Sequence, residues 1–169
     1  MLSDPESISR AAERLSAAAV VGFDTETRPS FRKGVQYPVS LLQLALPDVV
    51  FLLRLQEHGL PEDIAAVLSN AKIKKVGIGT KDDVRQLARD FGCQARGVIS
   101  MDRIFRQRGY QVSSLRKLVG LVAGWRISKR QQTSNWAAPK LSEAQRRYAA
   151  ADAWLSLLLW DHLQQSPSD

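Results

Sequence analysis

Two acidic residues separated by one position directly follow an apolar stretch near the start of the chain. Asp24 and Glu26 come after the strand-forming residues 20–23, which predicts a buried strand with two carboxylates at its carboxyl end. Residues two apart in a strand point to the same face, so these carboxylates share one side of a sheet. Like charges at an apolar rim disfavour each other, and a hard cation would remove that cost. The alternative is a pair of solvated loop acids, and the motif alone is too common to exclude it.

A second pair of acids, Asp82 and Asp83, stands in the first turn of a predicted helix over residues 81–91. The helix dipole favours acids there, so capping alone explains them. The helix follows a short predicted strand, however, and strands joined through a helix are usually parallel neighbours. Sites in such sheets collect beyond the carboxyl ends of the parallel strands. We therefore expect Asp82 or Asp83 to approach Asp24 and Glu26.

The last predicted helix carries a carboxylate on its apolar side. At 100° per residue, Asp152 points in the same direction as Tyr148 and Leu155, whereas Arg146 and Arg147 point away. A buried carboxylate needs a partner, and the nearby basic residues are not placed to supply one. We expect Asp152 to join the other acids with the Tyr148 phenol beside it. Without Asp152, the tyrosine would be interpreted as an ordinary core aromatic.

The remaining pattern predicts an α/β fold in which helices flank a mixed five-stranded sheet. Short connections make the first three strands an antiparallel meander, and helical connections make the last two parallel. Thr80 is the candidate N-cap of the helix at 81–91, and Ser3 or Asp4 that of the first helix. The predicted strands cover 20–26, 39–46, 49–55, 74–79 and 97–102, and the predicted helices cover 3–19, 62–70, 81–91, 113–122 and 142–165.

Composition places the chain among ordinary globular proteins. Its 169 residues suit a single domain, 1–169, and the longest apolar run near the C-terminus, 155–160, is too short to cross a membrane. The first residues show no pattern of a secretory signal. A single cysteine, Cys93, excludes an internal disulfide framework and is typical of a reducing compartment, so we expect a cytoplasmic protein.

The net charge of +7 is concentrated in one window. Residues 96–130 contain 9 Lys or Arg against 1 Asp or Glu, whereas the flanking segments are nearly balanced. Such a run is either solvated surface or a footprint for a phosphate backbone. The basic residues of this window that precede the predicted final helix and could line the path of a bound strand are Arg103, Arg106, Arg108, Arg116, Lys117, Arg126, Lys129 and Arg130.

Three segments together resemble the three exonuclease motifs of the DEDD superfamily of 3′–5′ exonucleases. The motifs, in the family's order and spacing, are Phe23-Asp24-Thr25-Glu26, then Val76-Gly77-Ile78-Gly79 with Asp83 and Leu87, then Tyr148-Ala149-Ala150-Ala151-Asp152. The tyrosine subtype (DEDDy) is indicated, because the histidine subtype would have its histidine at the position of Arg147. Within the superfamily, the chain is similar to the Werner syndrome exonuclease domain and to the ribonuclease D catalytic domain. The resemblance implies a ribonuclease H-like fold and release of nucleoside monophosphates from the 3′ end of nucleic acid.

The resemblance also implies the site residues. Asp83 is preferred to Asp82 because the family has an apolar residue four positions after the acid, here Leu87. Oxygen ligands and a phosphate substrate indicate two Mg²⁺ or Mn²⁺ ions per site and no organic cofactor. The implied metal ligands are Asp24, Glu26, Asp83 and Asp152, and Tyr148 is the fifth catalytic residue.

We assign hypothetical roles to these five residues on that basis. Asp24 bridges both ions, Glu26 and Asp152 complete the first site, and Asp83 holds the second ion through water. Tyr148 orients the attacking water, and Glu26 also meets the terminal 3′ hydroxyl.

The expected partner is nucleic acid, as single strands or the 3′ ends of duplexes, with DNA favoured and RNA possible. Backbone contacts predict binding that tolerates any sequence and weakens with salt. Lys129, seven residues before Trp136, matches a lysine of ribonuclease D-like sequences. The expected nucleic-acid contacts are Lys129, Arg126, Arg130, Arg103, Arg106 and Trp136.

Two rival interpretations remain. One is a catalytically inactive nucleic-acid-binding module of the same fold, which the presence of all four acids and the tyrosine disfavours. The other is a protein-interaction domain that uses an apolar patch on the outer side of the last helix, although burial under another helix also explains that patch. The patch residues are Trp154, Leu157, Leu158 and Trp160.

Overall fold

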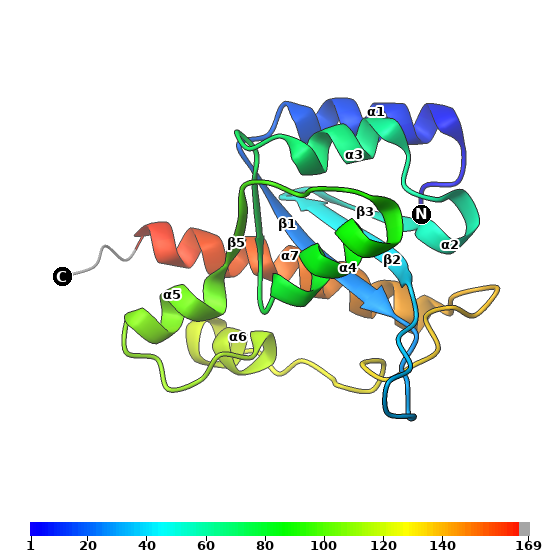
Figure 1. Ribbon diagram of the computed structural model, residues 1–169. Coiled ribbons are helices and arrows are strands. Elements are labelled where there is room, and N and C mark those ends of the chain that lie inside the picture. The colour runs from blue at the N-terminus through cyan, green and yellow to red at the C-terminus, as the bar shows by residue number, and fades with distance from the viewer. Residues whose placement is uncertain (166–169) are drawn as a thin grey trace.

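The computed structural model describes residues 1–165, and at its centre lies one mixed five-stranded sheet. The strand order is β3-β2-β1-β4-β5, with β1, β2 and β3 antiparallel in turn and β4 and β5 parallel to β1 (Figure 1). The predicted sheet and strand directions are confirmed. The strands are β1 (Val20–Thr27), β2 (Val39–Leu46), β3 (Val49–Arg54), β4 (Lys74–Gly77) and β5 (Val98–Ser100).

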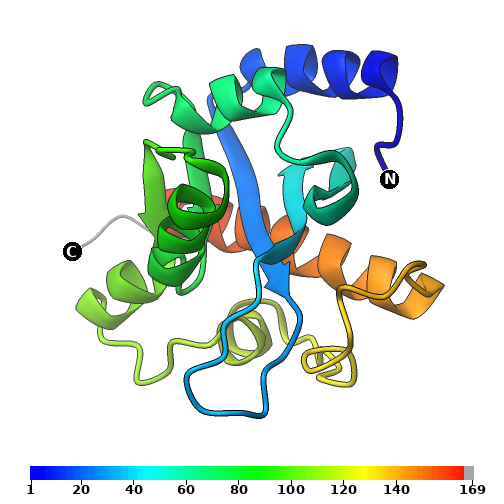
Figure 2. The ribbon, with the colours of Figure 1, turned by 45° about the vertical axis from the view of Figure 1, so that its right-hand side comes forward.

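Helices cover both faces of the sheet. One face packs against α1, α3 and α4, while the long α7 crosses the other face with α5 and α6 beside it (Figures 1 and 2). The helices are α1 (Pro5–Ser16), α2 (Leu55–His58), α3 (Glu62–Ser69), α4 (Lys81–Phe91), α5 (Met101–Gln107), α6 (Leu115–Ala123) and α7 (Glu143–Gln165).

The sequence prediction missed the two shortest helices, α2 and α5. The fifth strand was also predicted too long, because Met101 and Asp102 begin α5 instead of continuing β5. Of the two candidate caps for α1, Asp4 is the one used, since its carboxylate accepts the N–H of Ser7 at 2.8 Å. Thr80 occupies the predicted N-cap position of α4, but its hydroxyl makes no capping hydrogen bond.

Alternation along β1 sends neighbouring residues into different layers. Val21 and Phe23 are fully buried in the core with α1, α3 and α4, whereas Gly22 faces α7. A Cβ at Gly22 would lie only 2.1 Å from the carbonyl oxygen of Ala153, so glycine lets α7 lie directly on the strand. This close approach brings Asp152 beside the carboxyl half of β1.

The N-terminus of α7 is fixed by a capping box. Ser142 Oγ accepts the N–H of Gln145 at 3.2 Å, and the Gln145 side chain accepts the N–H of Ser142 at 3.0 Å. The amide of Gln145 also donates to Ser134 Oγ at 3.1 Å and to the Asn135 carbonyl at 3.2 Å. The cap therefore ties the start of α7 to the long connection that precedes it.

The outer side of α7 is partly covered. Trp154 donates its indole N–H to the carbonyl of Pro47 at 3.1 Å, and Leu157 is buried against the core shared with α6. Trp154, Leu157, Leu158 and Trp160 line a pocket together with Val122 and Ala123 of α6. Among residues 1–165, no helix combines the length and the apolar character needed to span a membrane.

Candidate active site

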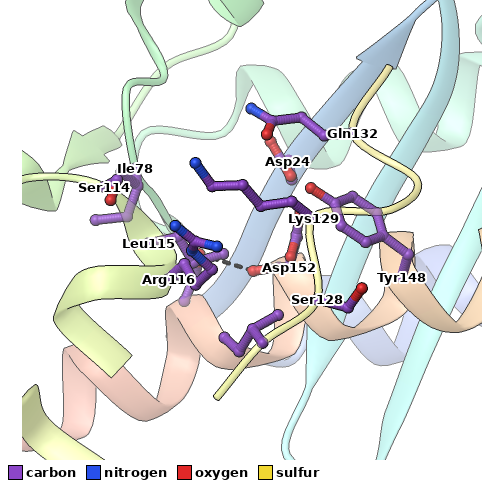
Figure 3. Close-up of a pocket in the computed structure, with 12 residues that line it drawn as sticks. Asp24, Ile78, Ser114, Leu115, Arg116, Ser128, Lys129, Gln132, Tyr148 and Asp152 are labelled. Atoms are coloured by element: carbon purple, nitrogen blue, oxygen red, sulfur yellow. Dashed lines mark hydrogen bonds between the residues drawn. The ribbon is translucent and has the colours of Figure 1, made fainter. Parts of the chain in front are cut away.

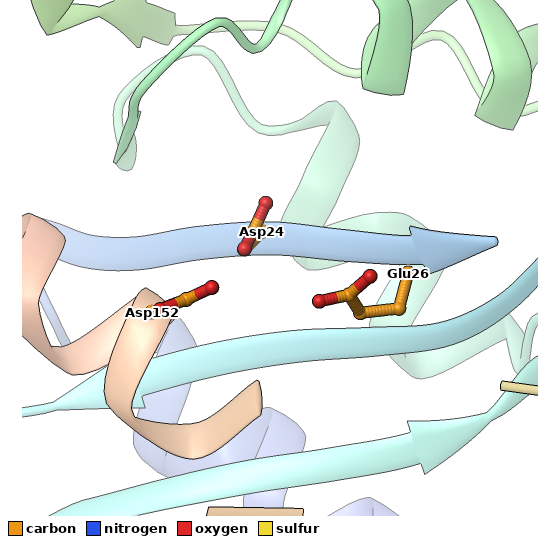
Figure 4. A group of neighbouring side chains, drawn as sticks. All are labelled: Asp24, Glu26 and Asp152. Atoms are coloured by element: carbon orange, nitrogen blue, oxygen red, sulfur yellow. The ribbon is translucent and has the colours of Figure 1, made fainter. Parts of the chain in front are cut away.

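Three carboxylates converge where β1 meets α7. Asp24 and Glu26 project from the same face of β1, and Asp152 projects toward them from α7 (Figure 4). One carboxylate oxygen from each lies within 4.8 Å of the others. Strand alternation and helix periodicity predicted this meeting, and the structure brings the three residues together.

The electrostatics of this cluster are unfavourable for the protein alone. Burial and the neighbouring acids raise the pKa of Glu26 to about 9 and hold the pKa of Asp24 well above its ordinary value. Burial raises the pKa of Asp152 to about 6. Within residues 1–165, the groups that lower these pKa values are neutral donors, namely the backbone of Thr25 for Asp24 and the Tyr148 hydroxyl for Asp152.

Hard divalent cations fit this donor set. Carboxylate oxygens are their preferred ligands, and a cation among three crowded carboxylates would offset both the repulsion and the loss of hydration.

The fourth acid reaches the site from the opposite layer. Asp83, in the first turn of α4, accepts a hydrogen bond at Oδ1 from the Thr25 hydroxyl, and its burial raises its pKa. Its charge also raises the pKa values of Asp24 and Glu26, which places it near the cluster. Asp82 is instead exposed and pairs with Arg85 at 3.0 Å. The geometry therefore favours Asp83 over Asp82 for the site.

Tyr148 lies one helical turn before Asp152. Burial and the surrounding carboxylates raise the pKa of its hydroxyl above the ordinary value, so the phenol keeps its proton and donates to Asp152. Behind it, the Trp136 ring lies with its centroid 6.0 Å from that of Tyr148.

Trp136 is fully buried, so the prediction that it contacts nucleic acid was wrong. Its bulk fills the core between β2, β3 and α7 and supports Tyr148 from behind. Residue type alone does not distinguish a stacking platform from a core aromatic, because both require a large ring.

The acids open into a pocket with basic residues on its rim (Figure 3). Asp24, Asp152 and Tyr148 form part of its lining, and Lys129 and Arg116 line it from other segments of the chain. Of the six residues expected to contact nucleic acid, Lys129 lines this pocket.

The other predicted basic contacts lie outside the pocket lining. Arg126 and Arg130 are exposed on either side of Lys129 in sequence. Arg103 and Arg106 belong to α5, and Arg106 is paired with Asp102 at 2.9 Å. Arg116 was noted only as part of the charged window, and no sequence signal indicated Gln132, which also lines the pocket.

Comparison with known proteins identifies the family of this chain. A family model described as 3′-5′ exonuclease matches residues 1–166. The chain belongs to the 3′–5′ exonuclease family. The mouse (Mus musculus) bifunctional 3′-5′ exonuclease/ATP-dependent helicase WRN is 31% identical over 156 residues, which cover 89% of this chain and 11% of that protein. The chain thus spans about a tenth of the length of that curated relative.

Solved structures have the same fold. Escherichia coli RNase D superimposes with a TM-score of 0.86 at 22% identity, over 98% of this chain and 44% of the other. A Trypanosoma brucei RNase D in complex with RNA U12 has a TM-score of 0.83 at 23% identity, over 95% of this chain and 60% of the other. The DEDD resemblance predicted from the sequence is confirmed at the level of family and fold.

Proposed function

We propose that residues 1–169 act as one catalytic domain that hydrolyses phosphodiester bonds from the 3′ end of nucleic acid and releases nucleoside monophosphates. One observation carries this proposal: one buried and two partly buried carboxylates converge at a pocket that Lys129 and Arg116 also line, and no cation from the described residues is among the groups that shift their pKa values. Such a site is costly for the fold and suited to cations that bind phosphate.

Two divalent cations, Mg²⁺ or Mn²⁺, are the proposed cofactors. Asp24, Glu26 and Asp152 would supply the compact set of ligands for the first, Asp83 would hold the second through water, and Asp24 would serve both. When bound, such ions lower the pKa of a water molecule and neutralise charge that develops on phosphate oxygens.

The protein's own groups orient the reactants. The Tyr148 hydroxyl keeps its proton, and we propose that it interacts both with Asp152 and with the attacking water. Glu26, at the end of β1, is proposed to accept a hydrogen bond from the terminal 3′ hydroxyl.

The basic rim is proposed to bind the backbone of the incoming strand. Lys129 and Arg116 line the pocket together with Asp24 and Asp152, and exposed Arg126 and Arg130 extend the same positive segment. Contacts to phosphates carry no sequence information, so we expect binding that tolerates any sequence and weakens steeply with salt.

Digestion of oligonucleotides labelled at the 5′ end tests the proposal. The substrates are single-stranded DNA, duplex DNA with a recessed 3′ end and single-stranded RNA, each with Mg²⁺, Mn²⁺ or EDTA. We expect ladders that shorten from the 3′ end only when a divalent cation is present. The relative rates on DNA and RNA identify the preferred sugar, because recognition of RNA depends on its 2′ hydroxyl.

A pair of adjacent substitutions supplies the control. Asp83→Asn should suppress digestion, whereas Asp82→Asn should leave it intact, because Asp82 is exposed and bound to Arg85. Tight, salt-sensitive binding with no metal-dependent shortening would instead identify the inactive binding module. Equal rates for the two variants would overturn the assignment of Asp83.

A further inference from the structure

Thr25 lies between Asp24 and Glu26 in β1, but its side chain lies on the opposite face of the sheet. Alternation points its side chain toward α4, on the side where Phe23 packs against Leu87, and away from the face that carries Asp24 and Glu26. The hydroxyl donates to Asp83 Oδ1, while the backbone of the same residue lowers the pKa of the Asp24 carboxyl. One residue thus connects two acids that come from different layers.

Of the four acids, Asp83 is the one whose position depends most on the Thr25 hydroxyl. Asp24, Glu26 and Asp152 form the compact cluster, and Asp83 stands outside it. A carboxylate accepts hydrogen bonds on both oxygens, so with Oδ1 held by Thr25 the second oxygen is left for a cation or its water.

Local chemistry offers Asp83 an alternative orientation. It stands in the first turn of α4, where free backbone N–H groups attract carboxylates, and its own N–H already lowers its pKa. Thr80 makes no capping bond there, so these donors are not all taken by a side-chain cap. Without the Thr25 hydroxyl, the carboxylate would turn back toward its own helix.

We propose that Thr25 is a positioning residue that directs Asp83 toward the second divalent cation, so that its hydroxyl sets the affinity for that cation. The inference rests on the proposed two-cation function. Groups that orient metal ligands from behind typically change metal affinity by about 10- to 100-fold when removed.

Titration of the full chain with Mn²⁺, followed by calorimetry and by the electron paramagnetic resonance signal of free Mn²⁺, tests this proposal. We expect Thr25→Val to weaken the weaker of two Mn²⁺ sites by about tenfold or more and to leave the stronger site unchanged. Thr25→Ser keeps the donor and should restore the wild-type isotherm.

Thr27 supplies a matched control on the same strand and the same face. Its hydroxyl bonds to the side chain of Gln86 at 3.1 Å, one helical turn beyond Asp83. Thr27→Val removes an equivalent link between β1 and α4 without touching an acid, so both Mn²⁺ affinities should stay at the wild-type values. If Thr25→Val does not fold, Thr25→Ala provides a second variant without the hydroxyl.

The outcomes separate this inference from the proposed function. Two Mn²⁺ ions bound with wild-type affinity by a folded Thr25→Val protein would overturn the role of Thr25 and leave the proposed function standing. Equal weakening in Thr25→Val and Thr27→Val would show a general effect of strand and helix packing and also overturn it. A wild-type protein that binds fewer than two Mn²⁺ ions would refute the two-cation proposal together with this inference.

Discussion

The two faces of the sheet bury charge in opposite ways. On the face toward α3, the side chain of Lys75 is fully buried, and its amine donates to the carbonyls of Asn70 at 2.8 Å and Val67 at 3.4 Å. On the face toward α7, Asp24 and Glu26 crowd against Asp152 with no cation from the described residues among the groups that shift their pKa values. The first arrangement is complete within the protein, and the second is not.

This contrast separates a structural charge from a functional one. The amine of Lys75 donates to acceptors that the fold itself supplies, and burial lowers its pKa to about 8. The acids meet mainly one another, which leaves their neutralisation to something that binds from outside. The predictions below test whether that difference is real.

The largest effect is expected for Asp24→Asn, which should move activity and stability in opposite directions. The rate of 3′ digestion should fall by about 10³-fold, equivalent to about 4 kcal/mol of lost transition-state stabilisation. The melting temperature in EDTA at neutral pH should rise, because an amide removes one of the crowded acids. Single-turnover digestion and thermal denaturation measure the two effects. A variant that is both inactive and less stable than wild type would mean that Asp24 is structural, as Lys75 is.

Tyr148→Phe should have the next largest effect. We expect a loss of about 10²-fold in turnover, because the phenol is proposed to orient the attacking water. Mn²⁺ affinity and melting temperature should change little, since the ring remains packed on Trp136. Tyr110→Phe is the matched control, because Tyr110 bonds to His162 at 3.2 Å and lines no part of the acidic pocket. Full activity of Tyr148→Phe would reduce the phenol to a partner that merely satisfies Asp152.

Replacing Lys75, whose charge is satisfied by the fold, should lower the free energy of unfolding and leave the rate of 3′ digestion unchanged. Lys75→Met keeps an unbranched apolar stem but removes the buried amine that donates to the carbonyls of Asn70 and Val67, at a cost of about 1 to 3 kcal/mol in the free energy of unfolding. Urea denaturation measures this cost, and Lys72→Met, at an exposed position, should show none. An increase in stability for Lys75→Met would place Lys75 in the same class as the acids and remove the contrast.

The sequence predicted features that depend on short-range periodicity and missed features that depend on contacts between distant segments. The meeting of Asp24, Glu26 and Asp152 follows from two short periods, alternation in a strand and the turn of a helix, so it was predicted. The contact between Thr25 and Asp83 was not predicted. An acid in the first turn of a helix can bond either to the backbone of its own helix or to a neighbouring strand, and the contact depends on which of these it bonds to.

The missed features share a different cause. The short helix α5 lies inside a window recognised only by its charge, and charge alone does not say which side of a helix faces a pocket. Lys129 and Arg116 line the pocket, whereas Arg103 and Arg106 from the same window do not, and the charge pattern did not distinguish them. The burial of Trp136 depends on packing against α7, and no local pattern records that contact.

The last expected effect is a pH dependence of stability in the metal-free protein. The folded-state pKa of Glu26 is raised from 4.5 to about 9 and that of Asp152 from 3.8 to about 6. Below the lower pKa of each pair, the group is protonated in both the folded and the unfolded chain, so it does not change the free energy of unfolding. As pH rises toward the folded-state value, the unfolded chain releases the proton first, so stability falls over that window.

Melting temperatures in EDTA should therefore decline between about pH 5 and about pH 9. A cation that binds only the folded state opposes this loss, so the gain in melting temperature with Mn²⁺ should grow with pH. Asp24→Asn combined with Glu26→Gln should flatten the decline in EDTA, whereas Lys75→Met should preserve it below about pH 8, because the pKa of Lys75 lies there. A decline that persists in the double variant would trace the pH dependence to groups outside the acidic site and leave the cation without a role in stability.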